Sequence, residues 1–167
     1  MQDRLAPVIA QTASSTNIFA AFSRSSARNI QRTKPDPFFL APDVDDATLG
    51  ATLRLALAGS KRISAQEFIK LFESRVIHQL SEDRERETMQ KYGYKTKRAM
   101  YKNMLCCWIS VADGKIEIKP TRHKSLDSYS GISNNGPEIQ CVPVTISDAD
   151  LSAALREGFK RCISSVS

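Results

Sequence analysis

The chain has 167 residues, of which 41% are hydrophobic and 25% are charged, with seven glycines and seven prolines. This composition is typical of one folded globular domain and excludes wholesale disorder. No apolar run approaches the roughly 20 residues that cross a bilayer, and the N-terminal residues lack the compact apolar block of a secretory signal. We therefore expect a cytoplasmic protein.

Charge is unevenly distributed along the sequence. The formal net charge is +6, yet residues 88–124 alone hold nine basic and two acidic side chains. Residues 1–34 hold five basic side chains and one acidic side chain, so the remainder of the chain is acidic overall. The middle of the chain is therefore the part that we expect to attract an anionic surface.

The N-terminal segment differs in composition from the rest. We predict a basic, partly ordered segment over residues 1–34, followed by one α+β domain over residues 35–167. The arginines, serines and alanines of the first segment also resemble those of a transit peptide. A frayed terminus with one short element docked on the core is the alternative that we favour.

Two predicted helices resemble each other. The first follows an N-cap at Asp45 or Asp46, and the last begins at Ser147 and buries an apolar face. Residues of the first recur in the last at an offset of 102. The repeated residues are Asp46, Leu49, Leu53 and Arg54 in the first helix and Asp148, Leu151, Leu155 and Arg156 in the last. Two similar amphipathic helices, or a pseudo-symmetric pair flanking one sheet, would both give this pattern.

A further helix is predicted between these two. Ser64 and Glu67 fit a capping box, in which each side chain satisfies a free backbone donor of the first turn. The helix continues into the charged stretch 81–87, which we expect to be a solvated end. Its apolar face consists of Phe68, Ile69, Phe72, Val76, Ile77 and Leu80.

The strands are predicted in the second half of the chain. Residues 105–111 and 115–119 flank Asp113-Gly114, which suits a two-residue hairpin because both residues tolerate positive φ. Residues 126–131 and 139–146 are further strand candidates. The fold class that we predict is α+β: an antiparallel sheet with a central Asp-Gly hairpin, packed against three main helices.

No constellation for catalysis is found in the sequence. The only histidines are His78 and His123, and no glycine-rich phosphate loop occurs. The cysteines, which have no CxxC spacing and are expected to be buried thiols, are Cys106, Cys107, Cys141 and Cys162. We predict that the protein is not an enzyme, with no catalytic residues, no metal and no cofactor.

The segment 89–104 alternates tyrosines with lysines. Tyrosine and arginine are favoured anchors of protein interfaces, whereas cations interleaved with aromatic rings also suit nucleic acid. A lysine-bordered edge strand is the purely structural alternative, and a helix beginning near Lys97 is left open. A second basic cluster at Arg122 and His123 would bind an anion or form a solvated loop. The candidate binding residues are Tyr92, Tyr94, Lys95, Lys97, Arg98, Arg122 and His123.

Several motifs together resemble one known family. They are Asp46–Gly50 leading to Leu53–Ser60, then Tyr92–Thr96, Met100–Met104, Ile116–Pro120 with His123-Lys124, and Leu151–Phe159. From about Pro35 onward the chain resembles the CdiI family, the immunity proteins of bacterial contact-dependent growth inhibition.

The resemblance implies a bacterial cytoplasmic inhibitor. It would bind the C-terminal toxin domain of a cognate CdiA effector one-to-one and neutralise it, and such toxins are commonly nucleases that act on tRNA or DNA. Inhibitors that plug a cationic nuclease cleft are usually acidic, whereas this chain is basic. Either its acidic remainder supplies the contact, or the basic segment meets an acidic patch away from the cleft, which we prefer.

Two other functions remain open at this stage. A nucleic-acid-binding module using residues 88–124 would bind unrelated RNA or DNA in a salt-sensitive manner. A purely structural subunit is also compatible with the pattern. The sequence does not identify the cognate toxin, its activity or the oligomeric state.

Overall fold

A computed structural model of the chain describes residues 40, 44–58, 65–102, 104–133 and 136–165. It has the predicted α+β class, whereas the basic segment 1–34 lies outside the described residues. The helices are α2 (Asp46–Ala58), α3 (Ala65–Glu73), α4 (Val76–Tyr92), α5 (Lys97–Tyr101) and α6 (Asp148–Lys160). The strands are β1 (Cys107–Ala112), β2 (Lys115–Ser125), β3 (Ser128–Gly131), β4 (Gln140–Pro143) and β5 (Ile163–Ser164).

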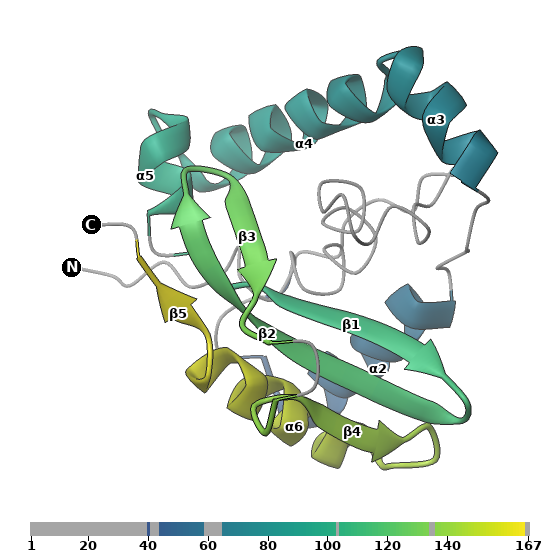
Figure 1. Cartoon of the computed structure of the whole chain (residues 1–167). Coiled ribbons are helices and arrows are strands. Elements are labelled where there is room, and N and C mark those ends of the chain that lie inside the picture. Colours follow the sequence, from purple (N-terminus) through teal and green to yellow (C-terminus); the bar gives the residue numbers. More distant parts are fainter. Residues whose placement is uncertain (1–39, 41–43, 59–64, 103, 134–135, 166–167) are drawn as a thin grey trace.

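The sheet is built around the long strand β2 (Figure 1). Strand β1 pairs with it antiparallel up to Ala112 opposite Lys115, so only Asp113 and Gly114, at φ 51° and 71°, lie in the loop. Strands β3 and β4 also pair antiparallel with β2. Strand β5 pairs with β2 in parallel. The sheet is therefore mixed, and the prediction of an antiparallel-only sheet was wrong. The reason is β5, a strand of only two residues that follows α6 and runs parallel to β2.

Strand β2 contributes to two separate cores. In its first half Ile116 and Ile118 are buried, and in its second half Thr121 and His123 are buried. Because successive side chains of a strand alternate between faces, this change from even to odd positions moves the buried side to the other face of the strand. The first half therefore belongs to the main core. In the second half His123 stacks on Tyr129, which packs against a smaller apolar cluster near α5.

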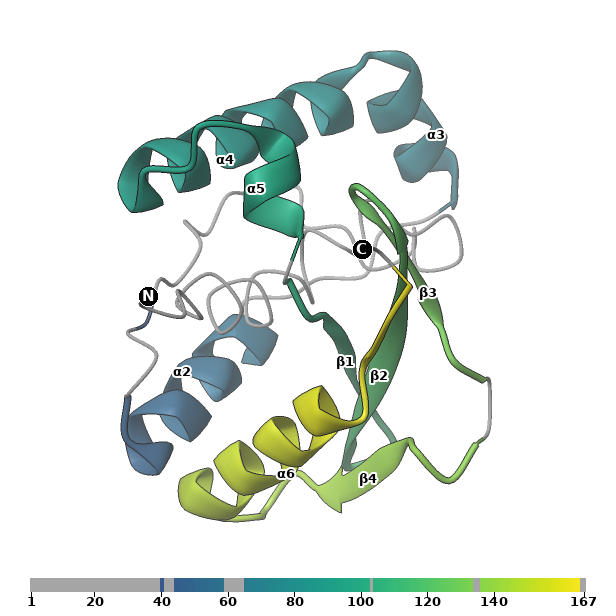
Figure 2. The same cartoon turned by 90° about the vertical axis from the view of Figure 1, so that its left-hand side faces the viewer.

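Helices α2 and α6 form a reciprocally bonded pair on one side of the sheet (Figure 2). Arg54 of α2 donates to the Asp148 carboxylate at 2.5 Å and also bonds the Ile146 carbonyl. Arg156 of α6 donates to the Asp46 carboxylate at 2.9 Å and to the Val44 carbonyl at 2.8 Å. These four partners are related in pairs by the offset of 102, so the repeat in the sequence corresponds to a pseudo-symmetric pair of helices that lie side by side.

The main core lies between this pair and the sheet. Two observations show how closely the layers pack: a Cβ on Gly50 would lie 1.9 Å from the Asp148 carbonyl oxygen, and one on Gly158 would lie 2.8 Å from Ile118. The buried residues of this core are Leu49, Leu53, Cys107, Ile109, Ile116, Ile118, Leu151 and Leu155. The last helix is capped as predicted, because the Ser147 hydroxyl accepts from the Asp150 N–H at 3.1 Å.

The helix predicted from Ser64 onward is divided in two. Arg75 adopts a left-handed conformation with φ 60°, which ends α3 and starts α4 in a new direction. The expectation of one continuous helix packed on the sheet was therefore wrong. Helices α3 and α4 instead form an arm that lies apart from the α2–α6 pair, as both views show (Figures 1 and 2). Ser64 lies outside the described residues, so its capping box stays a prediction.

None of the helices in the described part of the chain is both long and apolar enough to cross a bilayer.

Candidate functional site: the α4–α5 corner

The tyrosine- and lysine-rich segment folds into a helical corner, which comprises the last turn of α4, residues 93–96 and α5. Helix α4 ends because Gly93 takes φ 67°, and the Tyr94 N–H then bonds the Met89 carbonyl at 2.9 Å. Helix α5 begins at an N-cap, where the Thr96 hydroxyl accepts from the Ala99 N–H at 3.1 Å. The alternative of a lysine-bordered edge strand was therefore wrong, since glycine and threonine supply the two helix boundaries.

A small apolar cluster supports the α4–α5 corner from beneath. Met100, Tyr101 and Met104 are buried at its centre, and Met89, Tyr94 and Tyr129 pack around them. Tyr129 lies on β3, and its hydroxyl donates to the Met104 carbonyl at 3.2 Å. The corner is thus fixed to the end of the sheet rather than to the α2–α6 pair.

Glu85 anchors the corner to α4. Its side chain is only 10% exposed, accepts from the Tyr101 hydroxyl at 2.7 Å, and forms an ion pair with Lys97. The hydrogen bond to Glu85 raises the pKa of Lys97, and burial together with Glu85 raises the pKa of Tyr101. Both donors consequently remain protonated at neutral pH, and the carboxylate holds the start and the end of α5 in place.

Sequence reasoning missed the role of Glu85, because the stretch 81–87 was expected to be a solvated helical end. One signal was available. Glu85, Thr88, Met89 and Tyr92 follow the i, i+3, i+4, i+7 spacing of one helical face, and that face also holds the apolar side chains of the last turn. Glu85 and Thr88 are both buried in the structure.

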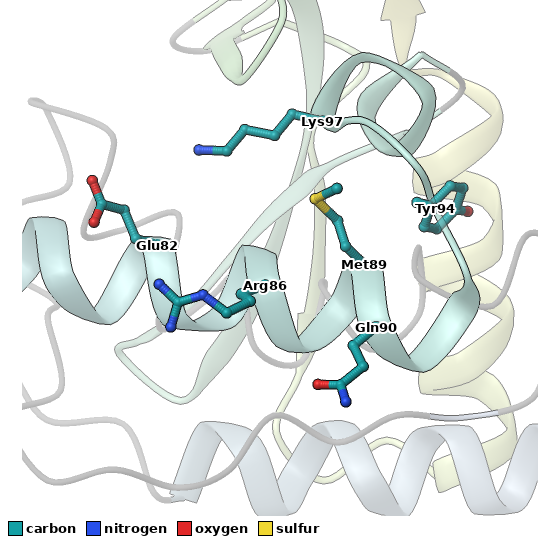
Figure 3. Close-up of a pocket in the computed structure, with 6 residues that line it drawn as sticks. All are labelled: Glu82, Arg86, Met89, Gln90, Tyr94 and Lys97. Atoms are coloured by element: carbon teal, nitrogen blue, oxygen red, sulfur yellow. The ribbon is translucent and has the colours of Figure 1, made fainter.

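An open hollow of about 510 Å³ lies between α4 and α5 (Figure 3). Its floor is apolar, formed by Met89, and charged groups of both signs surround it, as the close-up shows for Glu82, Arg86 and Lys97. Gln90 and Tyr94 complete the lining. An apolar floor with a charged rim suits the side chains of a protein partner, which combine apolar stems with polar ends.

The structure brings five of the seven candidate residues to this corner. Tyr92 and Tyr94 are half-buried, whereas Lys95, Lys97 and Arg98 are exposed. The side chains of Lys95 and Arg98 make no ion pair with any residue that the structure describes. The corner therefore presents two cations whose charge is available to a partner.

Arg122 and His123 do not join the exposed surface of the corner. His123 is 1% exposed, and its ring stacks on Tyr129 with centroids 4.5 Å apart. Its Nε2 lies 3.0 Å from the Leu126 carbonyl, so that nitrogen donates. Strand alternation places Arg122 on the opposite face of β2 from His123. His123 supports the corner from the interior, and its side chain is not accessible to a partner.

The corner brings aromatic, cationic and anionic groups together around a hollow. Among the residues that the structure describes, no three histidine, cysteine or acidic side chains come together in a way that would hold a metal ion. Such a combination is typical of α+β proteins that present a preformed surface to a macromolecular partner.

Comparison with known proteins identifies the family. The family model of CdiI, the CDI immunity protein, matches residues 14–162. The immunity protein CdiI-YPIII of Yersinia pseudotuberculosis serotype O:3 (strain YPIII) is 31% identical in a 134-residue alignment that covers 73% of this chain and 76% of the relative. The chain therefore belongs to the CdiI family of immunity proteins, and the family membership predicted from the motifs is confirmed.

Solved structures agree with this assignment. A protein of unknown function from Neisseria meningitidis superimposes with a TM-score of 0.69 and 31% identity, covering 78% of this chain and 82% of the other. A second match is to a CdiA-CT/CdiI toxin and immunity complex from Yersinia pseudotuberculosis. Its TM-score is 0.66 at 30% identity, and it covers 78% of this chain and 85% of that one.

Proposed function

We propose that this protein is a cytoplasmic immunity protein that binds the C-terminal toxin domain of its cognate CdiA effector and neutralises it, without catalysing a reaction. The observation that carries the proposal is the match over most of the chain to the CdiI family, together with the similarity to a chain of a toxin and immunity complex. The stoichiometry is one-to-one, and the toxin that it inhibits is a nuclease.

The α4–α5 corner supplies the contact. Lys95 and Arg98 project from a segment fixed at both helix boundaries, so the backbone that carries them loses little conformational freedom on binding. Tyr92 and Tyr94 beside them offer aromatic contact area. A standard interface buries roughly 800 Å² per partner, which a chain of 167 residues can present.

The charges at the corner favour an acidic patch on the toxin, away from the cationic cleft of a nuclease. Lys95, Arg98 and Lys102 are exposed at or next to the corner, whereas exposed Glu82 and Glu87 lie on α4. A cognate partner must match both signs at fixed positions. A mismatched toxin would leave buried charges unpaired, at about 2–5 kcal/mol each, which makes the pairing narrow.

Titration calorimetry tests the proposal. The purified protein is titrated against the C-terminal domain of the CdiA effector encoded beside it, with a toxin domain from an unrelated effector as the control. We expect one-to-one binding with a dissociation constant below about 10 nM, equivalent to about 11 kcal/mol, and no heat with the control. The same toxin domain should lose its nuclease activity when an equimolar amount of this immunity protein is added.

The rival function makes an opposite prediction in the same experiments. A nucleic-acid-binding module that uses residues 88–124 would bind bulk tRNA with an affinity that falls steeply as salt rises, and it would bind neither toxin. That outcome would overturn the proposed function. The pairing of Lys97 with Glu85 and of Lys119 with Glu117 weakens this rival, because both cations are already partly neutralised.

A further inference from the structure

Two cysteines lie in contact at the junction of α6 and β1. The sulfur atoms of Cys107 and Cys162 are 3.6 Å apart, although the residues are 55 positions apart in the sequence. Cys107 is the first residue of β1, and Cys162 follows the last turn of α6. A disulfide requires a sulfur separation of about 2.04 Å, so the two sulfurs need to approach by only about 1.6 Å.

The local fold brings the two cysteine sulfurs close to each other. Gly158 allows α6 to approach the sheet here, because a Cβ at this position would lie 3.3 Å from the Cys107 sulfur. The Cys162 sulfur also lies 3.1 Å from the Cys106 carbonyl, which orients it towards β1. Two features of the local structure therefore hold the pair together: the close approach of α6 at Gly158 and the contact of Cys162 with the Cys106 carbonyl.

The two thiols differ in accessibility and in acidity. Cys107 is completely buried, whereas Cys162 is partly exposed. The hydrogen bond between them lowers the pKa of Cys162 and raises the pKa of Cys107, and burial raises the pKa of Cys107 further. Cys162, the more exposed of the two residues and the one that deprotonates first, has the role of an attacking cysteine. The buried Cys107, which remains protonated, has the role of a resolving cysteine.

We propose that Cys107 and Cys162 form a reversible peroxide-sensitive pair that closes into a disulfide and ties α6 to β1. The Cys162 thiolate attacks one oxygen of hydrogen peroxide, the O–O bond breaks, and the released hydroxide takes a proton to become water. The Cys107 thiol then attacks the resulting sulfenic sulfur, forming the S–S bond and releasing a second water. The two sulfurs together lose two electrons, and the peroxide gains them.

The disulfide would stabilise the main core. It would close a loop of 55 residues that contains most of the sheet and α6, and this removes freedom from the unfolded chain. It would also fix the entry to β5, since Ile163 follows Cys162 directly. Reduction by a thiol would restore the open pair, so the state of the bond would follow the redox conditions around the protein.

The test begins with the reduced full-length protein and hydrogen peroxide in modest molar excess. We expect two of the four thiols to disappear, the intact mass to fall by two hydrogens, and the melting temperature to rise by about 5 to 10 °C. Dithiothreitol should reverse all three changes. Peptide mapping should join the peptide that contains Cys162 to the tryptic peptide 103–115.

Three variants assign the bond. Because Cys106 and Cys107 share one tryptic peptide, Cys106→Ala should retain the cross-link, and Cys107→Ala should abolish it. In Cys107→Ala the sulfenic acid on Cys162 should persist and be trapped by dimedone. Cys141 is exposed on β4, so Cys141→Ala is the matched control and should form the bond like the unsubstituted protein.

The opposite results would overturn the proposal. One such result is that peroxide leaves Cys107 and Cys162 as free thiols while it converts Cys141 into a sulfinic acid or an intermolecular disulfide. The two cysteines would then only fill space in the core and would have no redox role. Persistence of the cross-link in Cys107→Ala would equally exclude it. None of these results depends on the toxin, so they are independent of the proposed function.

Discussion

The two halves of this molecule are held together in different ways. The scaffold, formed by α2, α6 and the sheet, contains the main core, in which Leu53, Ile118 and Leu155 are each at most 1% exposed. The arm, formed by α3, α4 and α5, exposes Ile69, Phe72 and Val76 by 51%, 49% and 42%. It is joined to the sheet through the corner, where Glu85 and the cluster around Tyr101 hold it.

This difference separates the main source of stability from the proposed site of recognition. Burial of apolar side chains is the main source of folding free energy, so the scaffold provides most of the stability. Among the side chains whose burial the structure describes, most of those on α3 and α4 are exposed. Under the proposed function, this surface can vary with the toxin at small cost to the fold.

The largest expected effect is a difference in stability between two substitutions, each of one apolar residue from one half. Leu155→Ala removes a fully buried side chain from the main core and should lower the free energy of unfolding by about 3–4 kcal/mol. Phe72→Ala removes a side chain that is half exposed on α3 and should cost less than about 1 kcal/mol. Urea unfolding of both variants measures the contrast. Equal losses would contradict the division into scaffold and arm.

Two glycine substitutions test how much the close contact between α2 and α6 contributes to stability. Gly50→Ala would place a Cβ 1.9 Å from the Asp148 carbonyl oxygen, so the two helices must move apart, at about 2–3 kcal/mol. Gly114 has no heavy atom near its Cβ position but has φ 71°, so Gly114→Ala should cost about 1 kcal/mol. Chemical denaturation of both proteins decides the order, and a smaller loss for Gly50→Ala would refute the close helix contact.

The next prediction concerns the junction between the halves. Glu85→Ala leaves the buried Tyr101 hydroxyl without its acceptor and should cost about 2 kcal/mol of stability. Glu85→Gln keeps an acceptor oxygen and loses only the charge that attracts Lys97, so it should cost about half as much. Thermal unfolding gives both values. If Glu85→Ala had no effect, Glu85 would not be the anchor of the corner.

The smallest effect is a change in pH dependence. Hydrogen bonds from Arg156 and Ser152 lower the pKa of Asp46 below its ordinary value of 3.8. Because the folded-state pKa is depressed, this stabilisation is present above pH 3.8 and is lost as the pH falls through the lower, folded-state pKa. Asp46→Asn should therefore flatten the decline of stability in that acidic range. Asp113→Asn, which removes the same charge from the hairpin loop, is the control for net charge.

Local signals in the sequence predicted local structure well. The cap at Ser147 and the apolar spacing of Leu151 and Leu155 located α6, because caps and helical faces depend on residues only a few positions apart. The repeat that relates Arg54 to Arg156 reflects a pseudo-symmetric pair of helices, which the sequence alone did not distinguish from two merely similar helices. The partners of the two arginines are about 90 to 110 positions away, and only the fold shows that the bonds are reciprocal.

The remaining features depended on long-range contacts. No glycine or proline marks the break at Arg75, so the continuous apolar spacing wrongly predicted one helix. His123 was predicted at a binding surface because it follows a basic strand, whereas the change of face along β2 buries it under Tyr129. The corner itself was located by composition, and Glu85, its anchor, was missed because a carboxylate is normally exposed.

Two matched charge reversals test the central claim, that the arm recognises the toxin and the scaffold does not. Arg98 lies on α5, whereas Lys115 lies at the far hairpin end of β2 (Figure 1). Calorimetric titration with the cognate CdiA toxin domain should show about 100-fold weaker binding for Arg98→Glu, and a change of less than about threefold for Lys115→Glu. Loss of binding in Lys115→Glu with full binding in Arg98→Glu would contradict the account.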